Sequence, residues 1–234
     1  MCMGVGVRIY PIDDNAITVA FDLPIGEVAH RKVMLLQRAL QENKQSGILE
    51  IVPAYNSLAI YFVTKTPKAD LLTFVKQWAD KVYAENNEND LTDLTNESHV
   101  VIPVCYEPAY ASDIITLSKI LSISLEDIVM HHSKKSYQVF MNGFIPGFAY
   151  MGTLDPILHV PRKQTPTLRV PAGSVAIAAS QTGIYPLEVS GGWHIIGRTP
   201  IKMFDKKRNP ACLLQPGQTV SFRPITSSEF QNWS

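Results

Sequence analysis

The sequence has 234 residues, of which 46% are hydrophobic and 18% are charged, so it can bury one large core or two modest ones. No continuous apolar run reaches the length of about 18 residues that a membrane helix needs, and the first residues, MCMGVGVRIYPIDD, lack the features of a secretion signal. We therefore expect a cytoplasmic protein. Cys2, Cys105 and Cys212 lack the paired spacing of a zinc site or a redox dithiol, and we expect them to be reduced.

The two halves of the chain carry opposite charges. Residues 1–133 hold 10 Lys and Arg against 17 Asp and Glu, whereas residues 134–234 hold 11 against 4. The positive half suits an anionic ligand. An equally open alternative is that the two halves complement each other, or complement a partner protein.

The first ninety residues alternate between strand-like and helix-like patterns. Strands are predicted at 5–10, 16–21, 48–52 and 57–63, and a turn at 11–15. Two amphipathic helices are predicted because apolar residues recur about every 3.6 positions. The residues that mark them are Ala29, Val33, Leu36 and Leu40 in the first helix, and Leu71, Val75, Trp78 and Val82 in the second. This order predicts a ferredoxin-like α/β sandwich over residues 1–84.

The segment 85–98 is acidic and polar, which predicts a linker. A strand at 100–105 and two helices are predicted after it. Ser124 is the expected N-cap of the second helix, because Asp127 follows three residues later in the pattern of a capping box.

From residue 137 onward, short β-branched or aromatic stretches are separated by Gly and Pro. This texture predicts a small closed β-barrel over residues 99–234, and the whole chain is then an α+β protein. The predicted barrel strands are 137–141, 174–178, 194–196 and 219–222.

Three segments of this half suggest binding chemistry. The loop 143–152, GFIPGFAYMG, is either a tight loop with aromatic pocket walls or a structural turn with its rings in the core. The small residues of 174–180, SVAIAAS, leave room for a groove. Glycine-rich turns at 190–193 and 197–200 can bind phosphate through backbone N–H groups, although neither is a P-loop.

Six ordered blocks resemble the family that unites the B subunits of 5-oxoprolinases, kinase inhibitors and the first subunits of allophanate hydrolases. They are GFIPGFAYMG at 143–152, PR at 161–162, RVPAGS at 169–174, QTGIYP at 181–186, GGW at 191–193, and IGRTP at 196–200 with FD at 204–205. The resemblance implies a small N-terminal α/β domain and a cyclophilin-like C-terminal barrel. Two positions depart from it, since Ala149 stands where the family usually has Pro, and Val189-Ser190 where it has Ser-Pro.

The resemblance implies the B subunit of an ATP-dependent 5-oxoprolinase, which opens the lactam of 5-oxoproline to glutamate together with subunits A and C. ATP with Mg²⁺ is the expected cofactor, bound on this chain or at a site shared with a partner. Two alternatives are a regulatory protein that inhibits a sporulation-type histidine kinase, and a component of allophanate or urea degradation. We expect no nucleic acid or membrane partner.

The expected catalytic residues are His132, Arg198 and Asp205. His132 is either a base or a packed histidine at a helix end. Arg198 either holds an anion or braces a loop, and Asp205 either orients another group or fixes a turn. The expected substrate- or nucleotide-binding residues are Phe144, Pro146, Gly147, Phe148, Tyr150, Arg162, Arg169, Gly173, Ser174, Gln181, Thr182, Gly192 and Trp193. The histidines show no metal-ligand spacing, so no metal site is expected.

Overall fold

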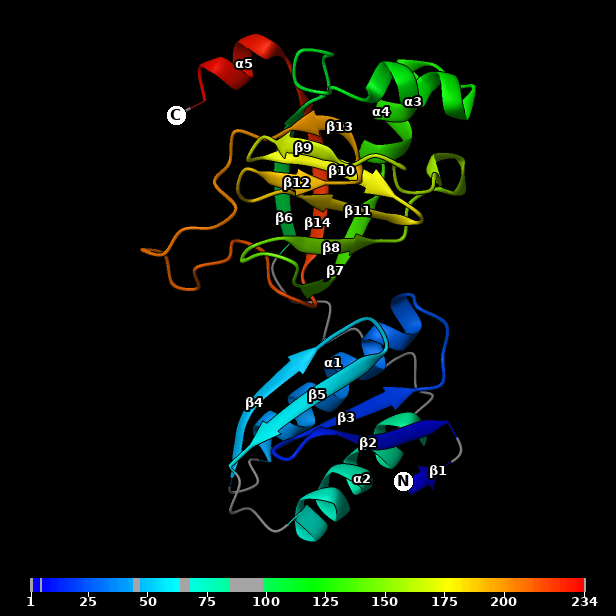
Figure 1. Cartoon of the computed structure of the whole chain (residues 1–234), viewed down its shortest axis with the longest axis vertical. Coiled ribbons are helices and arrows are strands. Elements are labelled where there is room, and N and C mark those ends of the chain that lie inside the picture. The colour runs from blue at the N-terminus through cyan, green and yellow to red at the C-terminus, as the bar shows by residue number, and fades with distance from the viewer. Residues whose placement is uncertain (1, 5, 44–46, 64–67, 85–98, 234) are drawn as a thin grey trace. The chain divides into compact units, whose positions relative to one another are not determined.

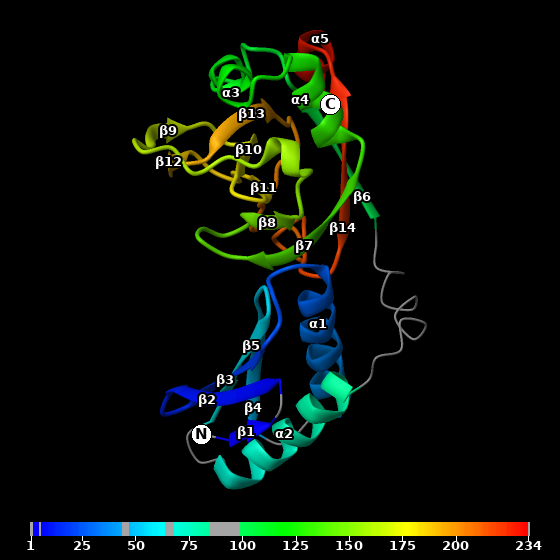
Figure 2. The same ribbon diagram turned by 90° about the vertical axis from the view of Figure 1, so that its right-hand side faces the viewer.

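The computed structural model describes residues 2–4, 6–43, 47–63, 68–84 and 99–233 (Figures 1 and 2). The chain divides into two compact units, Met1–Asn96 and Glu97–Ser234. The predicted linker 85–98 lies outside the described residues, so the linker and the domain bounds 1–84 and 99–234 stay predictions. Within the described ranges, no helix combines the length and the apolar character needed to cross a membrane.

The N-terminal unit is an antiparallel sheet with two helices. Its described elements are β1 (Cys2–Gly4), β2 (Val7–Asp13), β3 (Ala16–Phe21), α1 (Glu27–Glu42), β4 (Ile48–Pro53), β5 (Ser57–Phe62) and α2 (Lys68–Ala84). The strand order is β1-β2-β3-β5-β4, and both helices cover the same face of the sheet (Figure 2). The predicted element order is confirmed, with the short β1 added at the edge. The name ferredoxin-like stays a prediction.

The core of this unit lies between the helices and the sheet. Val33 and Leu36 of α1 and Leu71 and Val75 of α2 are fully buried, as the apolar spacing predicts. They pack in one cluster with residues of β2, β3 and β5. The amphipathic pattern therefore identifies both the helices and the faces that they bury.

One predicted turn in this unit is wrong in extent. The sequence predicts a turn over 11–15, but β2 continues through Pro11 to Asp13. Pro11 pairs with Ile17 of β3 on one side, while β1 ends opposite Ile9 on the other. Pro11 therefore lies beyond the described part of β1, next to the register shift between Pro11 and Asp13, and proline is tolerated at such edge or irregular positions.

The C-terminal unit contains most of the strands. Its elements are β6 (His99–Cys105), α3 (Ile114–Leu121), α4 (Leu125–Ser133), β7 (Ser136–Asn142), β8 (Ala149–Gly152), the 3-10 helix η3 (Pro156–Leu158), β9 (Thr167–Val170), β10 (Ser174–Ala178), β11 (Gln181–Ile184), β12 (Val189–Gly191), β13 (His194–Arg198), β14 (Thr219–Ile225) and α5 (Ser227–Gln231).

Strands of this unit close into a barrel in the order β10-β11-β8-β7-β14-β6-β13, with β13 pairing back onto β10. The β14 and β6 pair is parallel. A separate two-stranded sheet, β9 and β12, lies beside the barrel (Figure 2). The predicted barrel is confirmed, and the name cyclophilin-like stays a prediction. The sequence does not predict β8, β9, β11 or β12, which are only three or four residues long.

Two helices pack against the barrel. α3 contacts β13, and α4 contacts β14. The predicted capping box at the start of α4 is confirmed, because the Ser124 hydroxyl accepts from the Asp127 N–H at 3.0 Å and the Asp127 carboxylate accepts from the Ser124 N–H at 3.3 Å. This cap stabilises the start of the helix, and His132 lies fully buried in its last turn.

Candidate functional site

The two faces of β10 pack against different layers. Val175 and Ile177 belong to the barrel core, whereas Ala176 and Ala178 belong to a second cluster outside it. The other buried members of this second cluster are Phe148, Val170, Tyr185, Trp193 and Ile195. Because alanine side chains are small, large rings pack directly on the strand. The small residues that suggest a groove in the sequence therefore support an aromatic layer.

This aromatic layer forms one wall of a cavity of about 230 Å³. Phe148 meets Tyr185 and Trp193 edge to face, with ring centroids 5.1 and 5.5 Å apart. This geometry is favourable for aromatic pairs and holds the rings in fixed orientations. The lining residues are Phe144, Phe148, Tyr150, Arg162, Pro166, Tyr185, Ser190, Gly191, Gly192 and Trp193.

The loop before β8 brings two phenylalanines to the cavity. The Gly143 N–H donates to the Phe148 carbonyl at 3.1 Å, and the Phe148 N–H donates to the Ile145 carbonyl at 3.1 Å. Gly147 has φ +87°, and a β-carbon there would lie 2.8 Å from the β-carbon of Phe204. Only glycine suits this position. The turn buries Phe148 and leaves Phe144 59% exposed at the cavity mouth.

Arg162 is held between two backbone anchors. The imidazole Nε2 of His194 donates to the Pro161 carbonyl at 3.0 Å, and the Lys163 N–H donates to the Gly192 carbonyl at 2.8 Å. These anchors join the segment around Arg162 to the start of β13 and to the turn that precedes it. The Arg162 guanidinium carbon lies 6.0 Å from the centre of the Trp193 ring.

A salt bridge strengthens this attachment. The Lys163 ammonium donates to the Asp113 carboxylate at 2.7 Å and to the Thr167 hydroxyl at 2.6 Å. The same Asp113 oxygen accepts from the Ile195 N–H at 2.7 Å. The start of α3, the strand β13 and the segment 161–167 are thus joined by one carboxylate.

Two tyrosines of the lining remain neutral hydrogen-bonding groups. Burial raises the pKa of Tyr150 and of Tyr185, and in each case the nearby positive charge of Arg162 opposes part of the rise. A hydrogen bond with the Trp193 backbone also opposes the rise in the Tyr185 pKa. Arg162, Tyr150 and Tyr185 all line the same cavity.

The structure brings together six of the residues expected from the sequence to bind a ligand. They are Phe144, Phe148, Tyr150, Arg162, Gly192 and Trp193, and all of them line the cavity. The remaining lining residues are Pro166, Tyr185, Ser190 and Gly191, which are not among the residues expected from the sequence. Tyr185 and Gly191 both stand in the blocks that carry the family resemblance, so that signal could have identified them.

His132 and Thr182 lie inside the barrel, fully buried and bonded to each other. The Thr182 hydroxyl donates to the Ala176 carbonyl at 3.2 Å, so it accepts from His132 Nε2 at 2.8 Å. His132 Nδ1 then accepts from the Tyr106 hydroxyl at 2.8 Å. Burial lowers the His132 pKa to about 3. These contacts hold a neutral imidazole in the core, and they place it away from the cavity lining.

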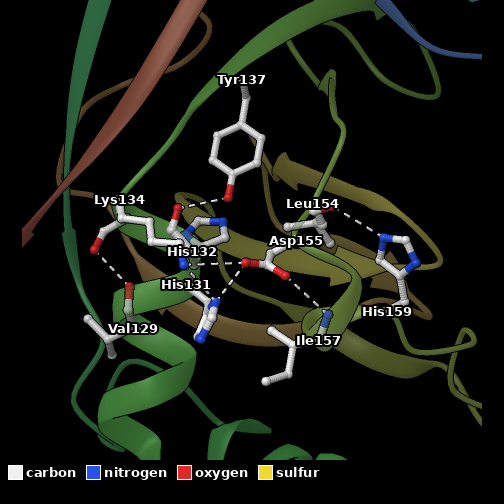
Figure 3. A network of polar contacts seen from close by, with 10 residues as sticks. Val129, His131, His132, Lys134, Tyr137, Leu154, Asp155, Ile157 and His159 are labelled. Carbon is white, nitrogen blue, oxygen red and sulfur yellow. Dashed lines mark hydrogen bonds and ion pairs between the residues drawn. The ribbon is translucent and has the colours of Figure 1, made fainter.

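Neighbouring polar groups hold the end of α4 (Figure 3). The Tyr137 hydroxyl donates to the His132 carbonyl at 2.8 Å, and His131 Nδ1 pairs with the Asp155 carboxylate at 2.7 Å. The hydrogen bond from His131 holds the Asp155 pKa at about 2, below its usual value. Asp155 also accepts from the Ile157 N–H, which begins η3. This network anchors the helix and the following loop to the barrel.

Arg198 and Asp205 make contacts within loops. The Arg198 Nε donates to the Ala172 carbonyl at 2.8 Å, and its guanidinium carbon lies 5.9 Å from the centre of the Phe230 ring. Asp205 accepts from the Lys207 N–H at 2.9 Å and from the Lys202 ammonium at 3.0 Å, and the hydrogen bond from Lys207 lowers its pKa. Neither side chain lines the cavity, and their expected catalytic roles stay predictions.

The other expected binding residues also lie outside the cavity lining. Arg169 is an exposed residue of β9, and Pro146 is exposed beside the buried Gly147. Ser174 and Gln181 begin β10 and β11, and Gly173 precedes β10 with φ +84°. Their roles in binding stay predictions. Within the described ranges, no group of three or more His, Cys, Asp or Glu side chains could hold a metal ion.

The sequence of this chain is similar to a protein-family profile and to named proteins. The family profile described as carboxyltransferase domain, subdomain C and D, matches residues 7–214. A Bacillus subtilis (strain 168) protein named as the B subunit of 5-oxoprolinase is 33% identical over 235 residues, covering 97% of each chain. A Haemophilus influenzae protein of the same name is 35% identical over 219 residues, covering 92% of this chain and 97% of that one.

Solved structures are also similar to most of this chain. The crystal structure of TTHA0988 is 32% identical and superimposes with a TM-score of 0.76 over 91% of this chain. The similarity spans 40% of that longer chain.

Proposed function

Because this chain belongs to the carboxyltransferase-domain family of subdomains C and D, together with the proteins named as the B subunit of 5-oxoprolinase, we propose that it is the B subunit of an ATP-dependent 5-oxoprolinase. It works in a complex with subunits A and C. The complex opens the lactam of 5-oxo-L-proline to L-glutamate and hydrolyses ATP, and this chain is inactive alone.

The chemistry explains why such a reaction uses ATP. An unstrained lactam is a poor electrophile, and its oxygen is a poor leaving group. Phosphoryl transfer to that oxygen makes the ring carbon a better electrophile. One water adds to this carbon and the ring nitrogen leaves as the amine, which gives an acyl phosphate, and a second water hydrolyses the acyl phosphate to the carboxylate and inorganic phosphate. The complex must therefore bind a small ring, orient it and exclude bulk water around it.

The observation that carries the proposal is the aromatic cavity with Arg162 at its edge. It lies in the blocks that resemble the family, and it offers apolar ring faces, neutral hydroxyls and one positive charge. These groups suit recognition of a small organic acid. The lining contains no His, Asp or Glu and therefore supplies no general base. This supports the proposal that the companion proteins complete the site.

ATP with Mg²⁺ does not fit this cavity. Nucleotide phosphates call for several donors or cations, yet the lining holds a single arginine and its volume is below the roughly 300–1,000 Å³ of typical ligand pockets. The glycine-rich turns at Gly143–Gly147 and Gly191–Gly192 lead into β8 and β13 rather than opening helices. We therefore assign no step of phosphoryl transfer to this cavity and propose ATP binding at a partner or shared surface.

Three finer assignments belong to the same proposal. The N-terminal unit is a ferredoxin-like domain, which the antiparallel order β2-β3-β5-β4 and the two helices on one face support. The barrel is cyclophilin-like. The assembled enzyme works in the cytoplasm.

Reconstitution tests the proposed function. Purified companion subunits A and C are incubated with 5-oxoproline, ATP and Mg²⁺, with and without this protein, and glutamate is measured. We expect glutamate to form only when all three proteins are present. Full activity of the companions alone, or none with all three when each is folded, would contradict the proposal.

A further inference from the structure

The shape and chemistry of the cavity restrict its ligand. Five aromatic side chains line a space of about 230 Å³, and several of them are locked edge to face. Such a space is too small for a drug-sized molecule and suits a single flat ring. The apolar faces favour a ring with exposed carbon atoms, because burying them removes apolar surface from water.

The charge of the lining restricts the ligand further. Among the ten lining residues Arg162 carries the one charge, and no carboxylate is present to neutralise it. Within the described residues, no hydrogen bond or ion pair to an acidic side chain is seen for Arg162, whereas Lys163 is paired with Asp113 and Lys202 with Asp205. A guanidinium next to a half-enclosed apolar space favours one anionic group, and a carboxylate matches its planar donors.

The neutral hydroxyls of the lining complete the match. Burial raises the pKa of Tyr150 and of Tyr185, which keeps both protonated well above neutral pH, and Ser190 adds a third hydroxyl. Hydroxyls both donate and accept, so they can bind a ring that contains an amide N–H and a carbonyl. The lining thus provides partners for a ring amide and a carboxylate at the same time.

We propose that this cavity binds a compact cyclic monocarboxylate, whose carboxylate contacts Arg162 and whose ring lies among Phe148, Tyr150 and Trp193. The identification of that ligand as 5-oxoproline rests on the proposed function. This chain then holds the lactam, and the nucleotide binds elsewhere in the complex.

Direct binding to this chain alone tests the inference without any activity. Isothermal titration measures 5-oxo-L-proline binding to the full-length protein and to Arg162→Ala, Arg162→Lys and Arg223→Ala. Arg223 is an exposed residue of β14 that does not line the cavity, so it serves as the control. We expect Arg162→Ala to weaken binding roughly tenfold to a hundredfold, Arg162→Lys to weaken it less, and Arg223→Ala to leave it unchanged.

Analogues of 5-oxoproline test the contributions of the carboxylate and of the lactam ring separately. We expect 2-pyrrolidinone, which has the lactam but no carboxylate, to bind at least tenfold more weakly than 5-oxoproline to the wild type, and equally weakly to Arg162→Ala. We expect ATP with Mg²⁺ not to compete with 5-oxoproline. Equal affinity of wild type and Arg162→Ala for 5-oxoproline, or its displacement by ATP, would overturn the inference.

The outcomes also separate this inference from the proposed function. Suppose that the reconstituted complex is active but that this chain alone does not bind 5-oxoproline at millimolar concentration. The proposed function then stands, and the assignment of the lactam to this cavity is overturned. Arginine-dependent binding by this chain without activity in any reconstituted complex supports the cavity assignment and overturns the proposed enzyme.

Discussion

The ammonium of Lys163 lies 2.7 Å from the carboxylate of Asp113, fifty residues away in the chain. Both side chains are largely buried, at 15% and 21% exposure. Because Lys163 directly follows Arg162, this bridge restrains the backbone that carries the Arg162 side chain. Asp113 and Lys163 are therefore positioning residues, and neither of them lines the cavity.

Breaking this bridge should change ligand binding through Arg162. We expect Lys163→Met to lower the free energy of unfolding by roughly 2 kcal/mol, because it leaves a charged carboxylate with little solvent. We also expect KM for 5-oxoproline to rise more than kcat falls in the reconstituted complex. Lys163→Arg, which retains the charge, should restore KM in part. An unchanged KM in a destabilised Lys163→Met variant would show that the bridge is only structural.

Substitutions at Gly191 and Tyr185 should have non-additive effects on stability. A β-carbon on Gly191 would overlap the Tyr185 hydroxyl and ring. We expect Gly191→Ala to destabilise the protein by about 1–3 kcal/mol and to weaken ligand binding. The double variant Gly191→Ala with Tyr185→Phe should recover part of this loss, since the hydroxyl is gone. Urea unfolding of the four proteins measures the coupling, and strictly additive effects would count against this packing.

His132 should make stability depend on pH. The unfolded chain takes up a proton on this side chain below about pH 6.5, whereas the folded protein does so only near its lowered pKa of about 3. The unfolded state therefore binds more protons between these values. Stability from this group is present above about pH 6.5 and is lost as the pH falls toward 3, by up to about 1.4 kcal/mol per pH unit.

The variant His132→Gln isolates this contribution. We expect it to be less stable than the wild type near neutral pH, because two buried hydrogen bonds are disturbed. The difference in unfolding free energy between the two proteins should shrink as the pH is lowered from about 7 to about 4. A difference that stays constant over this range would mean that His132 takes up its proton equally in both states.

The capping box of α4 offers a test of local structure. Ser124→Ala removes the hydroxyl that accepts from the Asp127 N–H. We expect a loss of about 1 kcal/mol in the free energy of unfolding, while Ser124→Thr, which retains a capping hydroxyl, should lose less. Urea denaturation measures both variants. Equal stability of Ser124→Ala and the wild type would show that the cap contributes nothing here.

Sequence reasoning works where one local pattern determines one element. The spacing of Val33 and Leu36 predicts α1, and Ser124 with Asp127 predicts the start of α4, because each signal arises within a few residues. The strands β9 and β12 are not predicted from the sequence. They are four and three residues long, and their pairing depends on segments about twenty residues apart.

Some residues of the candidate site can likewise be predicted from the sequence, and others cannot. The aromatic loop 143–152 predicts cavity walls, and the family resemblance directs attention to Arg162. Tyr185 and Gly191 come together only through the packing of the segments that follow β11 and form β12, which no local pattern reveals. The packed position of His132 at a helix end is one of the two alternatives that the sequence offers, whereas its hydrogen bond with Thr182 could not be predicted, since it depends on how α4 packs against the closed barrel.

The most direct test of the central claim is the substrate dependence of the reconstituted enzyme with wild type and Arg162→Ala. If this chain holds the lactam by its carboxylate, KM for 5-oxoproline rises roughly tenfold to a hundredfold and KM for ATP stays unchanged. The opposite pattern, a raised KM for ATP with an unchanged KM for 5-oxoproline, would contradict this claim and place the nucleotide at Arg162.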